Sequence, residues 1–155
     1  MDTDDLNNFT EVIVSTFEAT CNKKPFRSGP FQKASGGAIL FNGLMCTLTF
    51  TGGLNGTVIL IMSSSVACKM YGGMMMEEVE EVDEEVAEGF TEIANMIIGN
   101  IKADLGEHKL TFEPPALKIG EGEATSEMSD KTWLYIPMAF QEWGDFGLIL
   151  SIAPA

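Results

Sequence analysis

Two stretches of the chain repeat apolar residues every three or four positions, which is the spacing of an amphipathic helix. The first predicts a helix over 5–21, and acidic residues near its start suit the positive end of a helix dipole. The second predicts a long helix from Glu84 to about Asp104, with Asp83 as its N-terminal cap. Between them, Ser63–Ser65 can cap a short helix, which we expect to end at Gly72-Gly73 because glycine is common at helix C-termini.

Short apolar runs bounded by glycine and proline lie between these helices and after the last one, and they predict β-strands. In the first half we expect a short strand and turn from Phe26 to Gly37, a strand over 38–51 with a bulge at Asn42-Gly43, a hairpin turn at Gly52-Gly53, and a returning strand over 57–62. In the second half we expect one strand over 110–112 and 116–119 broken at Pro114-Pro115, then a hairpin of 133–141 and 146–152 around Trp143-Gly144-Asp145, with Pro137 at an edge or a bulge.

This order of elements predicts an α+β fold, a layered domain with a largely antiparallel sheet and two long helices. The two hairpins resemble each other, which suggests pseudo-duplicated α-β-β-β halves. The first helix carries Glu11 but has Val14 three residues later, where the long helix has Glu92 and Asn95. At this length one hydrophobic core suffices, so we expect 1–155 to form a single domain.

The long helix carries its polar groups on one face. At about 100° per residue, Glu88, Glu92, Asn95 and Gly99 fall within roughly 60° of one another, and the apolar residues cluster on the opposite side. A carboxylate and an amide one turn apart, followed by a glycine, provide two hydrogen-bonding groups and a flat position where another backbone can approach. The pattern therefore predicts a site presented to another protein.

The run in which Glu92 and Asn95 are followed by Met96-Ile-Ile-Gly-Asn100 resembles the active helix of the CheC/CheX/FliY family of chemotaxis phosphatases. The strand pair around Thr51–Ile61 and the closing Phe140–Leu150 are also similar, and the resemblance covers nearly the whole chain. Length and a single motif fit the CheX type best. The resemblance implies a CheC-like fold and hydrolysis of the aspartyl phosphate on a CheY-like response regulator.

The resemblance also implies roles for individual residues. Asn95 is expected to position the attacking water, and Glu92 to orient the complex by pairing with a lysine beside the phosphoryl group. Glu88, Met96 and Gly99 are expected to contact the partner. The chain needs no cofactor or metal site of its own, because the response regulator is expected to supply Mg²⁺. A homodimer is also implied. The alternative is a module that binds a response regulator or a flagellar switch component without catalysis.

Composition narrows the class of protein. Nine basic residues against 23 acidic ones give a formal charge of −14, which repels nucleic acids and anionic membranes, so neither is an expected partner. The apolar runs are shorter than the roughly 20 residues of a membrane span, and the acidic N-terminus does not look like a secretory signal. Three scattered cysteines have no ligand spacing and are expected to be reduced packing residues of a cytoplasmic protein.

Three other features have ordinary interpretations. The acidic run from Glu77 to Glu85 is expected to be a solvated loop and helix cap, because it lacks EF-hand spacing. For Met74–Met76, packing under this loop is favoured over an adaptable contact surface. His108 is the only histidine, does not belong to an acid or nucleophile pattern, and is expected to be a surface or capping residue.

Overall fold

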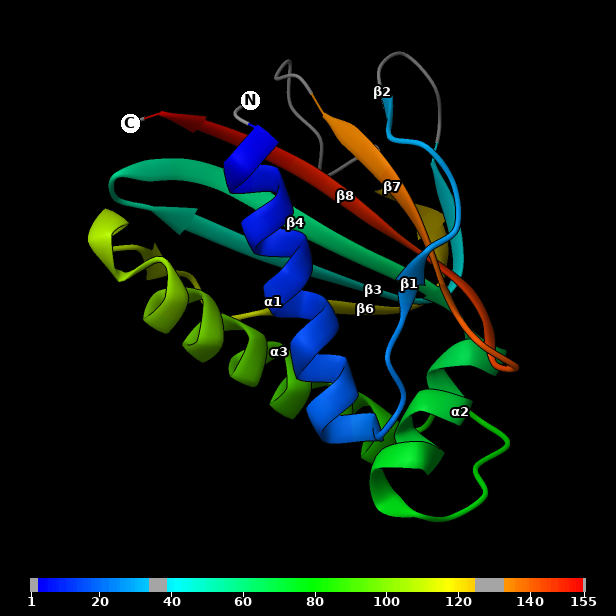
Figure 1. The fold of residues 1–155 in the computed structure, drawn as a ribbon. Coiled ribbons are helices and arrows are strands. Elements are labelled where there is room, and N and C mark those ends of the chain that lie inside the picture. The colour runs from blue at the N-terminus through cyan, green and yellow to red at the C-terminus, as the bar shows by residue number, and fades with distance from the viewer. Residues whose placement is uncertain (1–2, 34–38, 125–132, 155) are drawn as a thin grey trace.

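The computed structural model describes residues 3–33, 39–124 and 133–154. Within them, helices α1 and α3 lie across one face of an antiparallel sheet, and α2 follows the end of β4 (Figure 1). The elements are α1 (Thr3–Cys21), β1 (Phe26–Arg27), β2 (Gln32–Lys33), β3 (Leu40–Thr51), β4 (Leu54–Ser63), α2 (Ser64–Met75), α3 (Glu84–Asp104), the 3₁₀-helix η1 (Gly106–His108), β5 (Thr111–Phe112), β6 (Ala116–Glu123), β7 (Leu134–Phe140) and β8 (Gly144–Pro154). The expected α+β class is confirmed.

The two long helices form as their sequence patterns predict. Helix α1 begins two residues before the predicted start, and α3 has the predicted bounds. The carboxylate of Asp83 accepts a hydrogen bond from the backbone N–H of Val86 at 3.0 Å and so caps α3, as expected. Both helices bury one apolar stripe against the sheet, which is the usual source of helix stability in a folded domain.

Helix α2 starts at its predicted cap but ends later than expected. The Ser63 hydroxyl accepts from the N–H of Val66, and the helix then continues through Gly72-Gly73 to end at Met76, which has a left-handed backbone with φ of 56°. The prediction of an end at the glycines is wrong, because these glycines serve close packing. A Cβ on Gly73 would lie 2.6 Å from a ring carbon of Trp143.

The strand order is β1-β7-β8-β4-β3-β5, with β2 also paired to β7 and β6 to β3, and every pairing is antiparallel. Strands β5 and β6 lie in line along β3, which confirms one strand with a break. The strand order is nearly symmetric about the central β4–β8 pair. Strand β3 pairs with β5 and β6 of the second half, and β7 pairs with β1 and β2 of the first half. This topology agrees with two α-β-β-β halves.

Two expected irregularities take a different form. Asn42-Gly43 is not a bulge, because β3 pairs residue by residue with β4 and β6. Gly43 has φ of 148°, and a Cβ there would lie 2.4 Å from the backbone nitrogen of Ser64, so glycine permits the close approach of the β4–α2 junction. Pro137 stands in the interval between β1 and β2 along β7, with unbroken pairing to β8, so it lies beside the sheet edge and not at a bulge.

Several strands are longer than predicted. Strand β4 begins at Leu54, β6 extends to Glu123, and the final turn occupies 141–143. The Gly52-Gly53 turn is confirmed. The turn expected at Ser35–Gly37 lies outside the described residues.

The sheet buries apolar side chains on both faces. The larger cluster joins all three α-helices to residues such as Leu60 and Leu148, and a smaller cluster on the other face includes Met45 and Ile149. All three cysteines are free and buried, as expected. Among the described helices, none combines the length and the apolar character that crossing a membrane requires.

Candidate functional site

Helix α3 presents the predicted polar face to solvent. Its buried side contains Phe90, Ile93 and Ile97, which pack into the main core and fix the rotation of the helix about its axis. Glu88, Glu92, Asn95, Met96 and Gly99 are all exposed. The structure thus brings all five predicted site residues together on one accessible surface, which we call the α3 face.

Asn95 and Glu92 are not committed to structural roles. Within the described residues, neither side chain makes a hydrogen bond or salt bridge. By contrast, the Asn100 amide donates a 2.9 Å hydrogen bond to the Thr16 hydroxyl and thereby joins α3 to α1. The same helix therefore carries one asparagine used for packing and one whose amide is available to a partner.

Gly99 leaves open space on the α3 face. A Cβ built at this position has no heavy atom within 4 Å, so the fold itself does not require glycine there. Met96 beside it is 47% exposed. This end of the face therefore combines an adaptable apolar group with a position where another backbone can come close.

At its other end the α3 face borders a hollow of about 410 Å³ between α2 and α3 that sequence reasoning missed. Its lining residues are Tyr71, Met74, Met75, Glu77, Glu85, Glu88, Gly89 and Glu92. Tyr71 is only 6% exposed, and a Cβ on Gly89 would lie 2.5 Å from its ring. The Tyr71 ring therefore packs directly on Gly89. A glycine inside a predicted helix, where no turn requires it, was the sequence signal for this contact.

The surroundings of Tyr71 are strongly acidic. Burial raises the pKa of its hydroxyl, and the carboxylates of Glu85, Glu77, Asp83 and Glu92 raise that pKa further. The hydroxyl is consequently neutral at physiological pH. Among the described residues, no group of three or more His, Cys, Asp or Glu is arranged to hold a metal ion.

The neighbouring methionines correct one expectation. Met74 packs against the core, but Met75 is 50% exposed and Met76 is 93% exposed, because α2 continues to residue 75 and turns away at its cap. Packing under the acidic loop thus describes only Met74. The loop itself is solvated and ends in the Asp83 cap, as expected.

His108 lies in η1 and is partly exposed, with Glu107 at 3.5 Å and Asp5 at 4.0 Å from its Nε2 atom. Its backbone carbonyl accepts a 2.7 Å hydrogen bond from Gly53. This arrangement ties η1 to the β3–β4 turn. A surface position is therefore confirmed.

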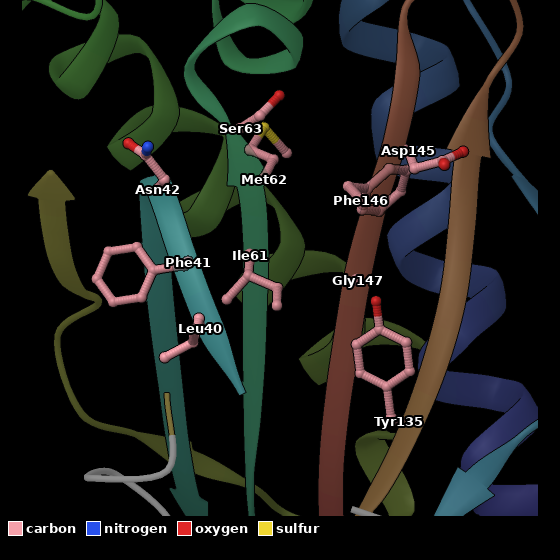
Figure 2. A pocket seen from close by; sticks show the side chains of 10 residues that line it. All are labelled: Leu40, Phe41, Asn42, Ile61, Met62, Ser63, Tyr135, Asp145, Phe146 and Gly147. Atoms are coloured by element: carbon pink, nitrogen blue, oxygen red, sulfur yellow. The ribbon is translucent and has the colours of Figure 1, made fainter. Parts of the chain in front are cut away.

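A second hollow of about 280 Å³ lies on the sheet face away from the helices, among β3, β4, β7 and β8 (Figure 2). Besides the Tyr135 hydroxyl, its lining includes three polar side chains, Asn42, Ser63 and Asp145. Asn42 donates to Glu121 at 3.3 Å, and Ser63 caps α2, so two of the three are already used by the fold. The Asn42 amide is therefore not available beside the Asp145 carboxylate, and the α3 face, where both the acid and the amide are uncommitted, is the candidate active site.

A model of the family "Chemotaxis phosphatase CheX" matches residues 44–139 of the chain, a span that includes α2, α3 and the α3 face. No curated protein matches the chain. The family model thus covers more than half of the sequence.

Solved structures share the fold over nearly the full length. A CheX protein from Desulfovibrio desulfuricans has a TM-score of 0.79 at 16% identity, covering 95% of this chain and 97% of that one. A CheC-like superfamily protein from Shewanella sp. PV-4 has a TM-score of 0.80 at 17% identity, covering 99% of each. A chain in the CheX–CheY–BeF₃–Mg²⁺ complex from Borrelia burgdorferi has a TM-score of 0.78 at 21% identity, covering 95% and 96%.

Proposed function

Because this chain belongs to the chemotaxis phosphatase CheX family, we propose that it hydrolyses the aspartyl phosphate of a CheY-like response regulator. The α3 face is the proposed active surface, with Asn95 and Glu92 inserted toward the phosphorylated site of the partner. The observation that carries the proposal is that both side chains are exposed and uncommitted on one face of a firmly packed helix.

The chemistry requires little from the phosphatase beyond positioning. An aspartyl phosphate is a mixed anhydride and is already activated, so catalysis consists largely of holding a water in line with phosphorus. The carbonyl oxygen of the Asn95 amide can accept a hydrogen bond from that water, while the amide nitrogen donates elsewhere. A carboxylate could accept as well, but its charge would oppose the phosphoryl oxygens.

Glu92 is proposed to orient the complex through an ion pair with a lysine beside the phosphoryl group. This pair would fix the depth to which Asn95 reaches. Glu88, Met96 and Gly99 are proposed to extend the contact along α3. The Borrelia burgdorferi complex contains Mg²⁺ together with CheY, in agreement with a metal that arrives with the response regulator.

The test is a phosphate-release assay with a panel of purified phosphorylated response regulators. The wild-type chain should accelerate release from at least one of them, and Asn95→Ala should reduce that rate by roughly 10²-fold, to the regulator's own rate. Asn95→Asp should be equally inactive, because it keeps the shape but adds a charge. Asn100→Ala is the matched control and should retain the rate of the wild type.

Two other outcomes have definite meanings. Saturable binding by the wild type without faster release would establish the non-catalytic binding module. An Asn95→Ala variant with normal activity would exclude the proposed role of the amide. Circular dichroism of each variant verifies that the helices remain folded.

The chain is further proposed to form a homodimer. Strand β6 borders the described sheet on one side, and its residue Ile119 is 50% exposed. Such an edge can pair with its counterpart in a second subunit. Light scattering during gel filtration should give twice the monomer mass, and Ile119→Lys should reduce it. A monomer at all concentrations would contradict the proposal.

A further inference from the structure

The hollow between α2 and α3 contains a tyrosine hydroxyl that no described residue pairs with. The Tyr71 ring is held on Gly89, and its hydroxyl makes no hydrogen bond within the described residues. Tyr71 lines this hollow and also a neighbouring one of about 390 Å³ beneath the acidic loop. Although the Tyr71 side chain is only 6% exposed, its hydroxyl oxygen reaches solvent, because no buried side-chain oxygen or nitrogen of the described residues lacks a hydrogen-bond partner. A group that enters the hollow can therefore replace water at this hydroxyl.

The charges around this space all have the same sign. Glu77, Glu85, Glu88 and Glu92 line the hollow, and in the described part of the chain none of them forms a salt bridge with lysine or arginine. Glu88 and Glu92 are one helical turn apart, so the two carboxylates repel each other in the free protein. A cation entering the hollow relieves this repulsion.

The walls of the hollow identify which kind of cation fits. Met74, the half-exposed Met75 and the Tyr71 ring provide apolar surface beside the carboxylates. Lysine and arginine side chains combine an apolar stem with a charged head, and they place the stem along such surface while the head reaches polar groups. The neutral Tyr71 oxygen can accept a hydrogen bond from the head group while its proton is directed to a glutamate.

We propose that this hollow is a second docking site of the phosphatase, which receives a lysine or arginine side chain on the surface of the response regulator bound to the α3 face. The assignment rests on the proposed function and deepens it. Glu92 lines both the hollow and the α3 face, so the two sites are continuous. The cation that enters the hollow is distinct from the lysine that pairs with Glu92 near the phosphoryl group. The hollow sets affinity and partner choice, whereas Asn95 sets the rate of the bound complex.

The decisive comparison is Glu85→Gln against Glu84→Gln. Both residues are exposed and lie in the first turn of α3, so the two variants lose the same charge and the same favourable interaction with the helix dipole. Of these two residues, Glu85 lines the hollow and Glu84 does not. The probe is the response regulator that the phosphate-release assay identifies, with beryllofluoride bound as a stable phosphoryl mimic. The readouts are its dissociation constant by calorimetry and the steady-state rate with the phosphorylated form.

Glu85→Gln should weaken binding roughly fivefold and raise KM by the same factor with kcat unchanged. Tyr71→Phe, which retains the ring on Gly89, should weaken binding roughly threefold. Glu84→Gln should bind as the wild type does. Equal losses in both glutamine variants would mean that only the general negative field attracts the partner, and no loss in Glu85→Gln would mean that no cation enters. Either result overturns the proposal.

A charge exchange identifies the partner residue. Each surface lysine or arginine of the regulator is replaced by glutamate, and each variant is tested with wild type and with Glu85→Lys. One regulator variant should bind the wild type weakly and recover affinity with Glu85→Lys; if none recovers, the docking site is wrong. Asn95→Ala separates the two proposals, because it should remove the rate acceleration while binding as tightly as the wild type.

Discussion

Replacing Gly99 with alanine should make the free protein more stable and at the same time a poorer phosphatase. Gly99 lies inside α3, five residues before its end, and nothing lies within 4 Å of the position a Cβ would take. Glycine in a helix interior costs about 0.5–1 kcal/mol relative to alanine. The folded monomer gains nothing in return, so the reason for glycine at this position is expected to lie in the complex.

The magnitude of each effect follows from the geometry. Without a clash, Gly99→Ala should raise the free energy of unfolding by about 0.5–1 kcal/mol, or roughly 2 °C in Tm for a domain of this size. If a partner backbone approaches this position, the added methyl group should cost about 1 kcal/mol of binding, or roughly fivefold in KM. The reacting groups are unaffected, so kcat should remain close to that of the wild type.

Gly89→Ala is the matched control on the same helix. Here a Cβ would lie 2.5 Å from the Tyr71 ring, which is buried and cannot simply move aside. Overpacking of this kind costs about 1–3 kcal/mol, more than the gain in helix propensity, so Gly89→Ala should be destabilised. Urea unfolding and steady-state phosphate release measure the two quantities in all three proteins. A stabilised Gly99→Ala with unchanged KM would refute the close approach, and a destabilised one would refute the assigned rotation of α3.

Three further predictions concern the fold. Asp83→Ala should lower stability by about 1 kcal/mol in urea unfolding, whereas Asp83→Asn should lose much less because asparagine also caps helices. Gly73→Ala should cost about 1–3 kcal/mol, since its Cβ would lie 2.6 Å from Trp143, and a stabilised variant would show that the helix does not need this close packing. Burial raises the pKa of Cys46 from 9.0 to about 12, so above pH 9 the unfolded chain releases a proton that the folded chain retains. Stability is therefore unaffected by this group below pH 9 and should fall by about 1.4 kcal/mol per pH unit above it, a slope that Cys46→Ala should reduce.

The sequence alone predicted the structure correctly wherever one periodic pattern decides which side of an element is buried. The apolar stripe of α3 fixes which side is buried, and that alone places Glu88, Glu92, Asn95 and Gly99 in solvent. The Asp83 cap required only a local rule. Element type and the face of each long helix were therefore predictable before any tertiary contact was known.

Predictions failed where a glycine acted through a distant neighbour. Gly43 was interpreted as a bulge and Gly72-Gly73 as a helix end, but Gly43 adjoins the β4–α2 junction and Gly73 adjoins Trp143, which lies 70 positions further along the chain. A glycine required by packing and a glycine required by a turn look the same in one sequence. The hollow at Tyr71 was missed for the same reason, because it exists only once α2 lies on α3 at Gly89.

The pseudo-symmetric halves show that side chains, and not the fold, distinguish the α3 face from the corresponding face of α1. When Phe9 is matched to Phe90, the buried residues Val12, Ile13 and Thr16 of α1 coincide with Ile93, Ala94 and Ile97 of α3. On this alignment Glu11 corresponds to Glu92, but Val14 stands in place of Asn95 and is partly buried against the core.

The same alignment places Glu18 at the position of Gly99 and Asn8 at that of Gly89. Helix α1 therefore has a carboxylate that corresponds to Glu92. It has no amide in place of Asn95, and it has no glycine at the positions of Gly99 and Gly89. Glu11→Gln should consequently leave phosphate release unchanged, whereas Glu92→Gln should impair it. Equal effects of the two substitutions would mean that overall negative charge, and not the assembled α3 face, governs the encounter with the response regulator.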